Sequence, residues 1–235
     1  MKKLGLVGGV GYLATLEYYK SINEEFKERL VNPPKSGANP PMVIDSLNIE
    51  TAYNFVAAGD WTSFTTLFLD AINRLALVGA EFGAIGANTA HIVFDELAKS
   101  SPIPLIGIVD ETCKEALRLG LKKLIIFGTD FTMKSGMYEK KCEEYGLVGI
   151  VPNEEDRQII HNIIFPNLEA GIVIPEEKAQ LLAIVNKIAK TTGADGLVLG
   201  CTELPFAIKA DDTELAVLDT GAIHVRAILD MILSD

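Results

Sequence analysis

Hydrophobic positions follow two patterns along this chain. Short apolar runs alternate with stretches in which apolar residues recur every three or four positions, as from Leu16 to Leu30 and from Phe64 to Val78. The first pattern is typical of buried strands and the second of amphipathic helices. We expect strands at 4–7, 42–44, 82–86, 104–108, 124–127, 147–151, 197–199 and 216–218, further helices around 159–168 and 181–188, and a proline- and glycine-rich loop at 33–41. This alternation predicts an α/β fold with parallel sheets covered on both faces.

Two sequence motifs occur twice, in the same order and at nearly the same spacing. Residues Lys2–Gly8 are echoed by Lys122–Gly128, and Gly79–Thr89 are echoed by Gly193–Glu203. Two coincidences of this kind predict an internal duplication. The chain is therefore expected to form two similar Rossmann-like α/β domains, related by a pseudo-twofold axis.

The duplication also predicts where the domains begin and end. Loops that follow equivalent strands would face each other across a cleft, and we expect the active site there. The predicted domains are residues 1–112 plus 208–235, and residues 113–207.

Charge and composition narrow the function classes. The chain has 235 residues and a net charge of −11, which argues against nucleic acid or an anionic membrane as a partner. Its apolar runs are shorter than the roughly 18–20 residues that span a bilayer, and glycines with a charged amphipathic segment follow the first run, so we interpret that run as a strand and not a signal peptide. Three widely spaced cysteines argue against a disulfide framework and for a reducing compartment, the cytoplasm.

Cys201 is the strongest candidate for chemistry. It follows an apolar strand and Gly200, where a turn or helix begins, and there a helix dipole can lower a thiol pKa from about 8.5 to roughly 3.5–7.5. The alternative is a small buried apolar residue. Thr202 and Glu203 provide polar neighbours and favour the functional interpretation. The other two cysteines, Cys113 and Cys142, lie in charged helical segments and are assigned to structure.

The equivalent segment of the first half carries a different residue set. Ala87 takes the place of Cys201, and Asn88 and Thr89 follow it. These two side chains can bind a carboxylate or can cap a helix, and the sequence leaves both interpretations open. For His91 we favour a buried, hydrogen-bonded histidine over a catalytic base.

The glycines after the first strand fit a dinucleotide-binding fingerprint only in part. Gly9, Gly11 and Ala14 match G-x-G-x-x-A, but the fingerprint requires an acidic residue about 20 positions later. The candidate, Asp45, comes later than that, beyond the proline-rich loop. A glycine loop that closes over a small anion is therefore the better interpretation.

Metal binding is not expected from the histidine and cysteine spacing. His91, His161 and His224 lie far apart, and neither H-E-x-x-H nor C-x-x-C occurs. Asp219-Thr220, with His224 one helical turn later, is interpreted as a capping or supporting group.

Taken together and in this order, the motifs resemble the aspartate/glutamate racemase family along nearly the whole chain. The segment 46–61 is most similar to the branch that acts on L-aspartate and L-glutamate. The resemblance is carried by Gly8-Gly9-Val10-Gly11 with Ala14-Thr15, Asn88-Thr89-Ala90-His91, Phe127-Gly128-Thr129 with Thr132-Met133, Gly200-Cys201-Thr202-Glu203, and Asp219-Thr220 with His224.

The resemblance implies a homodimeric amino-acid racemase that works without pyridoxal phosphate or another cofactor. In that family two thiols flank the substrate Cα, and one removes the proton while the other returns it on the opposite face. The implied substrate is a small acidic amino acid, and a dicarboxylate is an alternative ligand. The implied binding residues are Gly9, Val10, Asn88, Thr89, Thr129 and Thr202, supported by Glu203 and His91.

The sequence departs from the family pattern at Ala87, where the first thiol is expected. Alanine cannot transfer a proton, so either Thr89 or a water replaces the thiol, or the chemistry is one-sided. A single-thiol decarboxylase or isomerase, and a non-catalytic protein that binds small carboxylates, are the alternatives. A nucleotide-dependent oxidoreductase is a more distant one.

Overall fold

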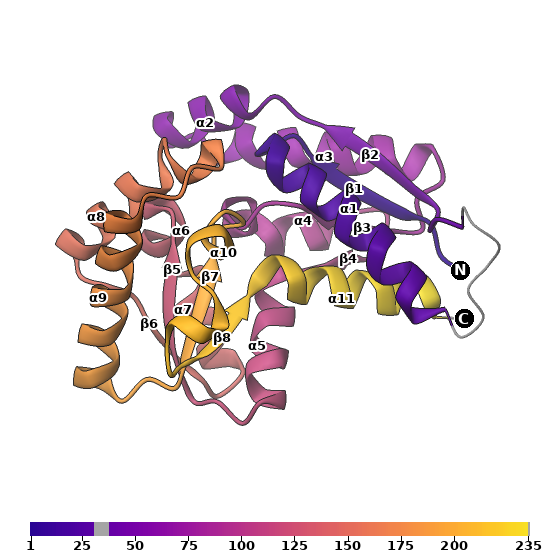
Figure 1. Cartoon of the computed structure of the whole chain (residues 1–235). Coiled ribbons are helices and arrows are strands. Elements are labelled where there is room, and N and C mark those ends of the chain that lie inside the picture. Colours follow the sequence, from indigo (N-terminus) through magenta and orange to yellow (C-terminus); the bar gives the residue numbers. More distant parts are fainter. Residues whose placement is uncertain (31–37, 235) are drawn as a thin grey trace. The chain divides into compact units, whose positions relative to one another are not determined.

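The computed structural model describes residues 1–30 and 38–234. It contains two four-stranded parallel sheets, with strand orders β2-β1-β3-β4 and β6-β5-β7-β8, and helices between the strands (Figure 1). The α/β class is confirmed. The two orders are the same when the strands of each sheet are numbered from its own first strand, so the duplication is present in the topology. Residues 33–37 of the predicted loop lie outside the described residues.

Each predicted strand is present. The strands are β1 (Leu4–Gly8), β2 (Met42–Ser46), β3 (Phe82–Ile85), β4 (Leu105–Ile106), β5 (Lys123–Gly128), β6 (Val148–Ile150), β7 (Gly196–Gly200) and β8 (Ala216–Asp219). Parallel strands buried on both faces are continuous apolar runs, which explains why the sequence pattern located them well.

The helices begin earlier along the chain than their apolar periods, and α8 (Glu154–Ile164) ends four residues before the end of the period predicted for it. The helix expected around 159–168 is α8, which begins after the N-cap Asn153 and ends at Ile164, and the one expected around 181–188 is α9, which begins with a proline. Polar caps and first turns add length without apolar spacing. The helices are α1 (Tyr12–Arg29), α2 (Ile49–Ala58), α3 (Trp61–Leu77), α4 (Phe94–Ser100), α5 (Ile108–Arg118), α6 (Asp130–Lys134), α7 (Met137–Glu144), α8 (Glu154–Ile164), α9 (Pro175–Thr192), α10 (Leu204–Ala207) and α11 (Thr220–Leu233), with short 3₁₀ helices η1 (Thr89–Val93), η2 (Leu168–Ala170) and η3 (Ala210–Asp212).

The chain divides into two compact units. Unit 1 is residues 1–107 with 224–235, and unit 2 is residues 108–223. The division expected from the sequence placed residues 208–223 with the N-terminal domain. In the structure this segment contains β8, which pairs with β7 over Gly196–Leu199 and so belongs to the second sheet.

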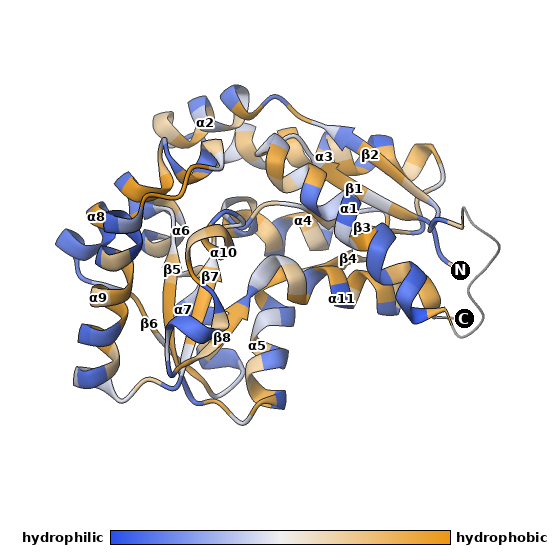
Figure 2. Cartoon of the chain, viewed as in Figure 1, coloured by the Kyte–Doolittle hydropathy of each residue, from blue (hydrophilic) through white to orange (hydrophobic). Residues whose placement is uncertain are grey.

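In unit 1, alternate residues of each strand face two different apolar layers. Leu4 and Leu6 of β1 pack with residues of α1 and α11, whereas Val7 packs with α2 and α3. Figure 2 shows the apolar residues of these strands and of the inward helix faces in orange. Burial of each large side chain contributes about 1.5–3 kcal/mol, so the sheet is held from both faces.

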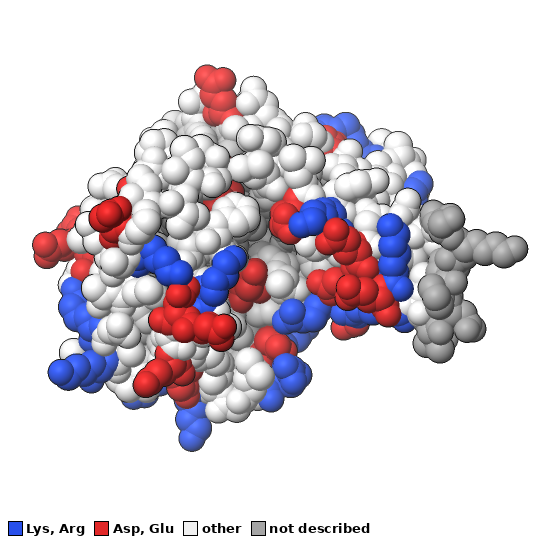
Figure 3. Space-filling model, in the orientation of Figure 1, with Lys and Arg blue, Asp and Glu red and all other residues white. Residues whose placement is uncertain are grey.

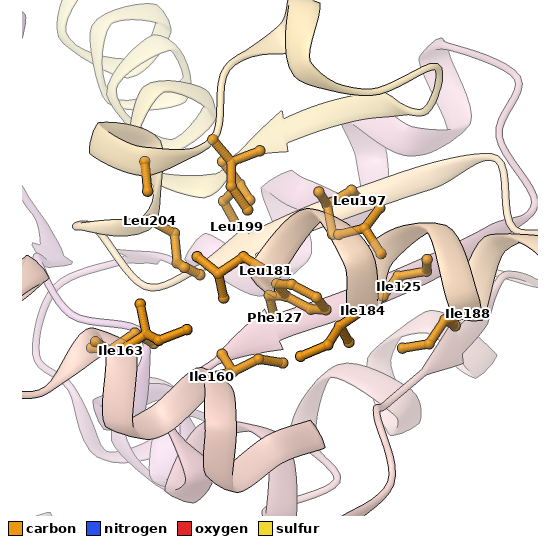
Figure 4. Packing of buried hydrophobic residues seen from close by; sticks show 14 of the residues in the cluster. Ile125, Phe127, Ile160, Ile163, Leu181, Ile184, Ile188, Leu197, Leu199 and Leu204 are labelled. Carbon is orange, nitrogen blue, oxygen red and sulfur yellow. The ribbon is translucent and has the colours of Figure 1, made fainter. Parts of the chain in front are cut away.

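Unit 2 repeats this arrangement. Ile125 and Phe127 of β5 face α8 and α9, and their packing with Leu197 and Leu199 of β7 is seen in Figure 4. The intervening β5 residues, Leu124 and Ile126, pack against α5 and α7 with Cys113 and Cys142.

The duplicated motifs form the same hydrogen-bonded clip in each unit. In unit 1 the Lys3 amide donates to the Glu81 carboxylate at 2.7 Å, and the Lys3 ammonium donates to the Val78 carbonyl at the end of α3. In unit 2 the Lys123 amide donates to Asp195 at 2.8 Å, and its ammonium donates to the Thr192 carbonyl at the end of α9. The repeated sequence motif therefore corresponds to a set of hydrogen bonds that connects the end of a helix to the starts of two strands.

Two further observations concern membrane-spanning helices and surface charge. Among the described residues, no helix combines the length and the apolar character needed to cross a membrane. On the face shown in Figure 3, acidic and basic side chains lie next to one another.

Candidate active site

Both units place their candidate residues at the same topological position. In a parallel sheet of order 2-1-3-4, ligands bind beyond the carboxyl ends of the first and third strands, where the strand order reverses. In unit 2 these strands are β5 and β7, which end at the paired residues Gly128 and Gly200. In unit 1 they are β1 and β3. Gly9 and Ala87 are thus the equivalents of Thr129 and Cys201.

Glycine is required at the strand ends of unit 2. A Cβ on Gly200 would lie 2.7 Å from the Phe127 carbonyl oxygen, and one on Gly128 would lie 3.0 Å from the Gly200 carbonyl oxygen. The two strand ends therefore approach closely, and this brings the segments that begin with Thr129 and Cys201 together. The ring of Tyr138 closes the other side of Gly200, at 3.4 Å from the Cβ position.

Cys201 is partly buried and donates a hydrogen bond from Sγ to the Glu203 carboxylate at 2.9 Å. The Thr202 hydroxyl donates to the same Glu203 oxygen, also at 2.9 Å. Glu203 is only 6% exposed, so this carboxylate is a buried acceptor shared by two donors. The three residues form one hydrogen-bonded group.

The pKa of Cys201 moves in the direction opposite to the prediction. Burial, together with the negative charge and hydrogen-bond acceptor of Glu203, raises the pKa of the Cys201 thiol well above its ordinary value, and Glu169 adds to this effect. The expected lowering by a helix dipole is wrong, because α10 begins only at Leu204 and has four residues. The resting group is a thiol and not a thiolate.

Thr129 caps the helix that follows β5. Its hydroxyl oxygen accepts from the Thr132 amide at 3.2 Å. Asp130, the next residue, forms ion pairs with Lys134 and Arg157, and these two cations dominate over burial and lower the Asp130 pKa. Thr129 therefore has a structural duty in addition to any contact with a ligand.

The glycine loop of unit 1 closes on its own chain. Gly9 has a φ of +78°, and a Cβ there would lie 2.1 Å from the Leu47 carbonyl oxygen. The Gly9 amide donates to the Thr15 hydroxyl at 2.8 Å, so it is already engaged within the loop. Val10, which follows, is partly buried against the apolar layer of α2 and α3.

The segment after β3 is buried and helical. Ala87 and Asn88 are 8% and 5% exposed, and Asn88 precedes η1 without a side-chain cap bond to the helix. Thr89 begins η1 and is partly buried. Ring nitrogen Nδ1 of His91 lies 2.9 Å from the Ala87 carbonyl oxygen, so His91 supports this segment from within.

The sequence motif at 219–224 spans the boundary between the two units. Asp219 accepts from the Ala222 amide at the start of α11, which is the capping role expected. The Thr220 hydroxyl donates to the Leu199 carbonyl of β7 at 2.8 Å. His224, four residues on, is fully buried in unit 1 beside Tyr18.

The remaining cysteines pack inside unit 2. Cys113 and Cys142 are fully buried, and their sulfur atoms lie 4.0 Å apart. Over the residues that the structure describes, no group of three or more His, Cys, Asp or Glu side chains is arranged to hold a metal ion.

Comparison with known proteins identifies the family. Residues 7–228 match the family described as Asp/Glu/hydantoin racemase. The chain belongs to this family. It is 23% identical over 226 residues, covering 95% of each chain, to the broad specificity amino-acid racemase RacX of Bacillus subtilis, and 27% identical over 165 residues to the glutamate racemase of Aquifex aeolicus, covering 68% of this chain and 62% of that one.

Solved structures of this racemase family share the whole fold. A putative Asp/Glu racemase from Yersinia pestis superimposes with a TM-score of 0.90 at 31% identity, and an aspartate racemase homologue from Pyrococcus horikoshii with 0.86 at 33% identity. Each comparison covers 100% of both chains. The α/β fold with two parallel sheets is therefore the fold of these racemase relatives.

Sequence reasoning missed two residues beside the candidate segments. Tyr18 bonds to His224, and Tyr138 contacts Gly200, but both lie within amphipathic helices and have the spacing of ordinary core residues. Their polar groups carry no local signal. Only the long-range packing shows what they touch.

Proposed function

We propose that this protein is a cofactor-independent amino-acid racemase in which Cys201 moves the Cα proton of a small acidic amino acid. The observation that carries the proposal is the hydrogen bond from the Cys201 thiol to the buried Glu203 carboxylate, at the carboxyl end of β7. Membership of the racemase family supports the reaction class. We also propose that the protein is a homodimer and that it is located in the cytoplasm.

In this proposal Glu203 accepts the proton of the Cys201 thiol and so produces the reactive thiolate. Abstraction of the Cα proton requires a thiolate, and transfer of the Sγ proton to Glu203 would produce one without release to solvent. Because its surroundings raise the pKa of Cys201, the thiolate is a stronger base than an ordinary one, although it is less populated. A strong base suits a weakly acidic Cα–H bond. Return of a proton from Sγ–H to the carbanion restores the Cα–H bond on that face, and the thiolate then takes its own proton back from Glu203.

In this proposal the substrate carboxylate binds Asn88 and Thr89, and Thr129 and Thr202 contribute polar groups. The supporting observation is that each of the four follows the carboxyl end of a strand of its own sheet: β3 for Asn88 and Thr89, β5 for Thr129 and β7 for Thr202. Gly9 contributes shape and not its amide, since Thr15 accepts that bond. Val10 is assigned to the same binding loop.

Ala87 favours a second candidate, a one-sided enzyme of the same superfamily. The position equivalent to Cys201 carries a methyl group, so the opposite face lacks the expected acid. A decarboxylase or isomerase needs protonation on one face only. Product chirality in deuterated solvent separates the two, because a one-sided enzyme gives a single labelled enantiomer.

The test is a circular-dichroism assay with both enantiomers of aspartate and glutamate. The panel also needs neutral and basic amino acids, because the carboxylates of Glu203 and Glu169 both act on Cys201 and disfavour an extra negative charge nearby. We expect Cys201→Ala to lower turnover by about 10²–10⁴-fold. Cys113→Ala, which removes a thiol far from Glu203 in sequence, is the matched control and should retain turnover. Lack of turnover or binding with every amino acid would contradict the proposal.

A further inference from the structure

The three polar residues after β7 turn their side chains toward one another. The Cys201 thiol and the Thr202 hydroxyl both donate to the same Glu203 oxygen, Oε2, each at 2.9 Å. The proposed proton transfer uses the thiol and the carboxylate, but it gives the second donor, Thr202, no part in the chemistry. The surroundings of Thr202 therefore bear on how the carboxylate is held.

The Glu203 side chain is not used to cap the helix that it precedes. Glu203 stands at the N-cap position of α10, yet its side chain makes no cap hydrogen bond. The backbone of this turn is fixed by the Leu204 amide, which donates to the Cys201 carbonyl at 3.2 Å, and by the Phe206 amide, which donates to the Glu203 carbonyl at 2.9 Å. Several rotatable bonds separate this backbone from the carboxylate, so the donors at the end of the side chain decide where Oε2 lies.

Thr202 is itself held in a defined orientation. Its methyl carbon Cγ2 lies 3.9 Å from the position that a Cβ on Gly221 would take, at the start of α11. Gly221 follows Thr220, whose hydroxyl donates to the Leu199 carbonyl of β7 at 2.8 Å. The surface beside the Thr202 methyl group is thus tied to the strand that precedes Cys201. A β-branched side chain is stiff at χ1, so a methyl group fixed on one side also fixes the hydroxyl on the other.

The hydrogen of the Thr202 hydroxyl is already committed. A hydroxyl has one hydrogen to donate, and Glu203 accepts it. In this arrangement Thr202 offers a ligand only its lone pairs and cannot donate to a substrate carboxylate. A hydrogen bond to an ionised acceptor is also stronger than one between neutral groups. The contribution of the hydroxyl to the reaction therefore passes through Glu203.

We infer that Thr202 is a positioning residue, which holds Oε2 of Glu203 within reach of the Cys201 thiol. A proton acceptor must lie within hydrogen-bond distance of the proton that it receives. The bond from Thr202 meets this condition before the substrate arrives, so that the carboxylate does not have to be reoriented during the reaction. The inference rests on the proposed function, in which Glu203 accepts the thiol proton.

The acidity of Cys201 reports where the Glu203 carboxylate lies. Burial raises the pKa of the thiol most, and the charge and hydrogen-bond acceptor of Glu203 raise it further, while a bond from the Glu203 backbone lowers it and Glu169 adds a smaller increase. Without the Thr202 hydroxyl the carboxylate is free to move away from Sγ, and its share of the increase is lost. The pKa of Cys201 then falls, because the opposing negative charge is more distant.

Two variants separate the hydroxyl of Thr202 from its shape. Thr202→Val keeps the branched shape and removes the hydroxyl, whereas Thr202→Ser keeps the hydroxyl. We expect iodoacetamide to label Cys201 about threefold faster at pH 8 in Thr202→Val without substrate, since half a pKa unit gives this gain in thiolate. Thr202→Ser should label at about the wild-type rate. In Thr202→Val kcat should fall about tenfold or more, with a smaller change in KM, because a misplaced acceptor slows the chemical step.

The double variant Thr202→Val/Glu203→Gln shows whether Thr202 acts through Glu203. Once the carboxylate charge is absent, loss of the hydroxyl should change the labelling rate by less than about twofold, since the two substitutions act on one group. A larger gain over Glu203→Gln alone would overturn the inference. A gain below about twofold in Thr202→Val itself, in a protein whose urea unfolding matches the wild type, would overturn it as well. If Thr202→Val does not fold, Thr202→Ala also lacks the hydroxyl and takes its place.

The labelling rates do not depend on turnover, so the two proposals fail separately. A rise in KM with unchanged labelling is the result for a residue that only contacts the substrate, and it would overturn the positioning role of Thr202 alone. Absence of turnover with every amino acid would overturn the proposed function, while the labelling rates still decide whether Thr202 holds Glu203.

Discussion

The ends of β3 and β7 are the same piece of architecture with different chemistry. Each strand is a member of the central pair of a 2-1-3-4 sheet, and a glycine stands at its carboxyl end. At the other end of each strand lies the same lysine–carboxylate clip. One then presents the methyl group of Ala87, supported by a neutral His91, and the other presents the Cys201 thiol, bonded to Glu203. The comparison teaches that the features which specify the fold are independent of the residue that carries the chemistry.

The largest expected difference between the two units is in their stability at low pH, because acid should destabilise unit 1 more than unit 2. Unfolded histidine has a pKa of about 6.5, whereas the pKa of His91 is lowered to about 4 and that of His224 to about 3. Between these values the unfolded chain binds protons that the folded chain does not, so this contribution is present above pH 6.5 and is lost as the pH falls. Each unit of pH from about 6.5 to 4 should remove about 1.4 kcal/mol per histidine.

Hydrogen exchange between pH 7 and 4 measures this difference. Unit 1, which contains both buried histidines, should lose protection before unit 2, whose His161 is partly exposed. His91→Leu should reduce the pH dependence of unit 1. Equal loss of protection in both units would contradict the account of the buried imidazoles.

Ala87→Cys should restore the missing thiol at the end of β3. We expect racemisation of aspartate or glutamate to rise at least about tenfold, since a positioned acid–base group contributes about 10²–10⁴ in rate. Ala87→Ser, of similar size but with a hydroxyl in place of the thiol, is the control and should give a smaller gain. An unchanged inversion rate in a folded Ala87→Cys protein would show that this face is already served by another group.

Glu203→Gln tests the other end. Loss of the carboxylate charge should lower the pKa of Cys201, because that charge now raises it, and each unit of decrease gives about tenfold more thiolate below the pKa. Iodoacetamide should therefore label Cys201 several-fold faster in the variant at pH 8, while turnover falls because the proton acceptor is lost. In the wild type Cys201 should still label faster than the fully buried Cys113 and Cys142, and aspartate should protect it. Slower labelling in Glu203→Gln would contradict the electrostatic role of Glu203.

Substitutions in the two lysine–carboxylate clips should give the smallest effect. The two clips should differ in how much they contribute to the free energy of unfolding. Asp195 accepts from the amides of Lys122 and Lys123, whereas Glu81 accepts from Lys3. We expect Asp195→Asn to cost about 1–2 kcal/mol in urea unfolding and Glu81→Gln about half of that. A larger loss in Glu81→Gln than in Asp195→Asn would contradict this order.

The sequence predicted the fold well and the electrostatics of the site poorly. Apolar runs located every strand, because parallel strands are buried on both faces. The domain boundary was misplaced since the pairing of β8 with β7 is a long-range contact that no local pattern encodes. The pKa shift of Cys201 had the wrong direction because it depends on how Glu203 folds back and on a helix that starts three residues later. Tyr18 is the same case, since only packing brings it to His224.

The central claim is that the proton chemistry belongs to Cys201 alone, and deuterium exchange tests it most directly. The wild-type protein is incubated with L-aspartate or L-glutamate in deuterated water, and Cα–H exchange is followed by NMR while inversion is followed by circular dichroism. A single thiol can remove a proton and return a deuteron on its own face, so exchange should proceed at least about tenfold faster than inversion. Ala87→Cys should bring the two rates together. Equal rates of exchange and inversion in the wild type would show that a second competent acid serves the face of Ala87, and would contradict the account.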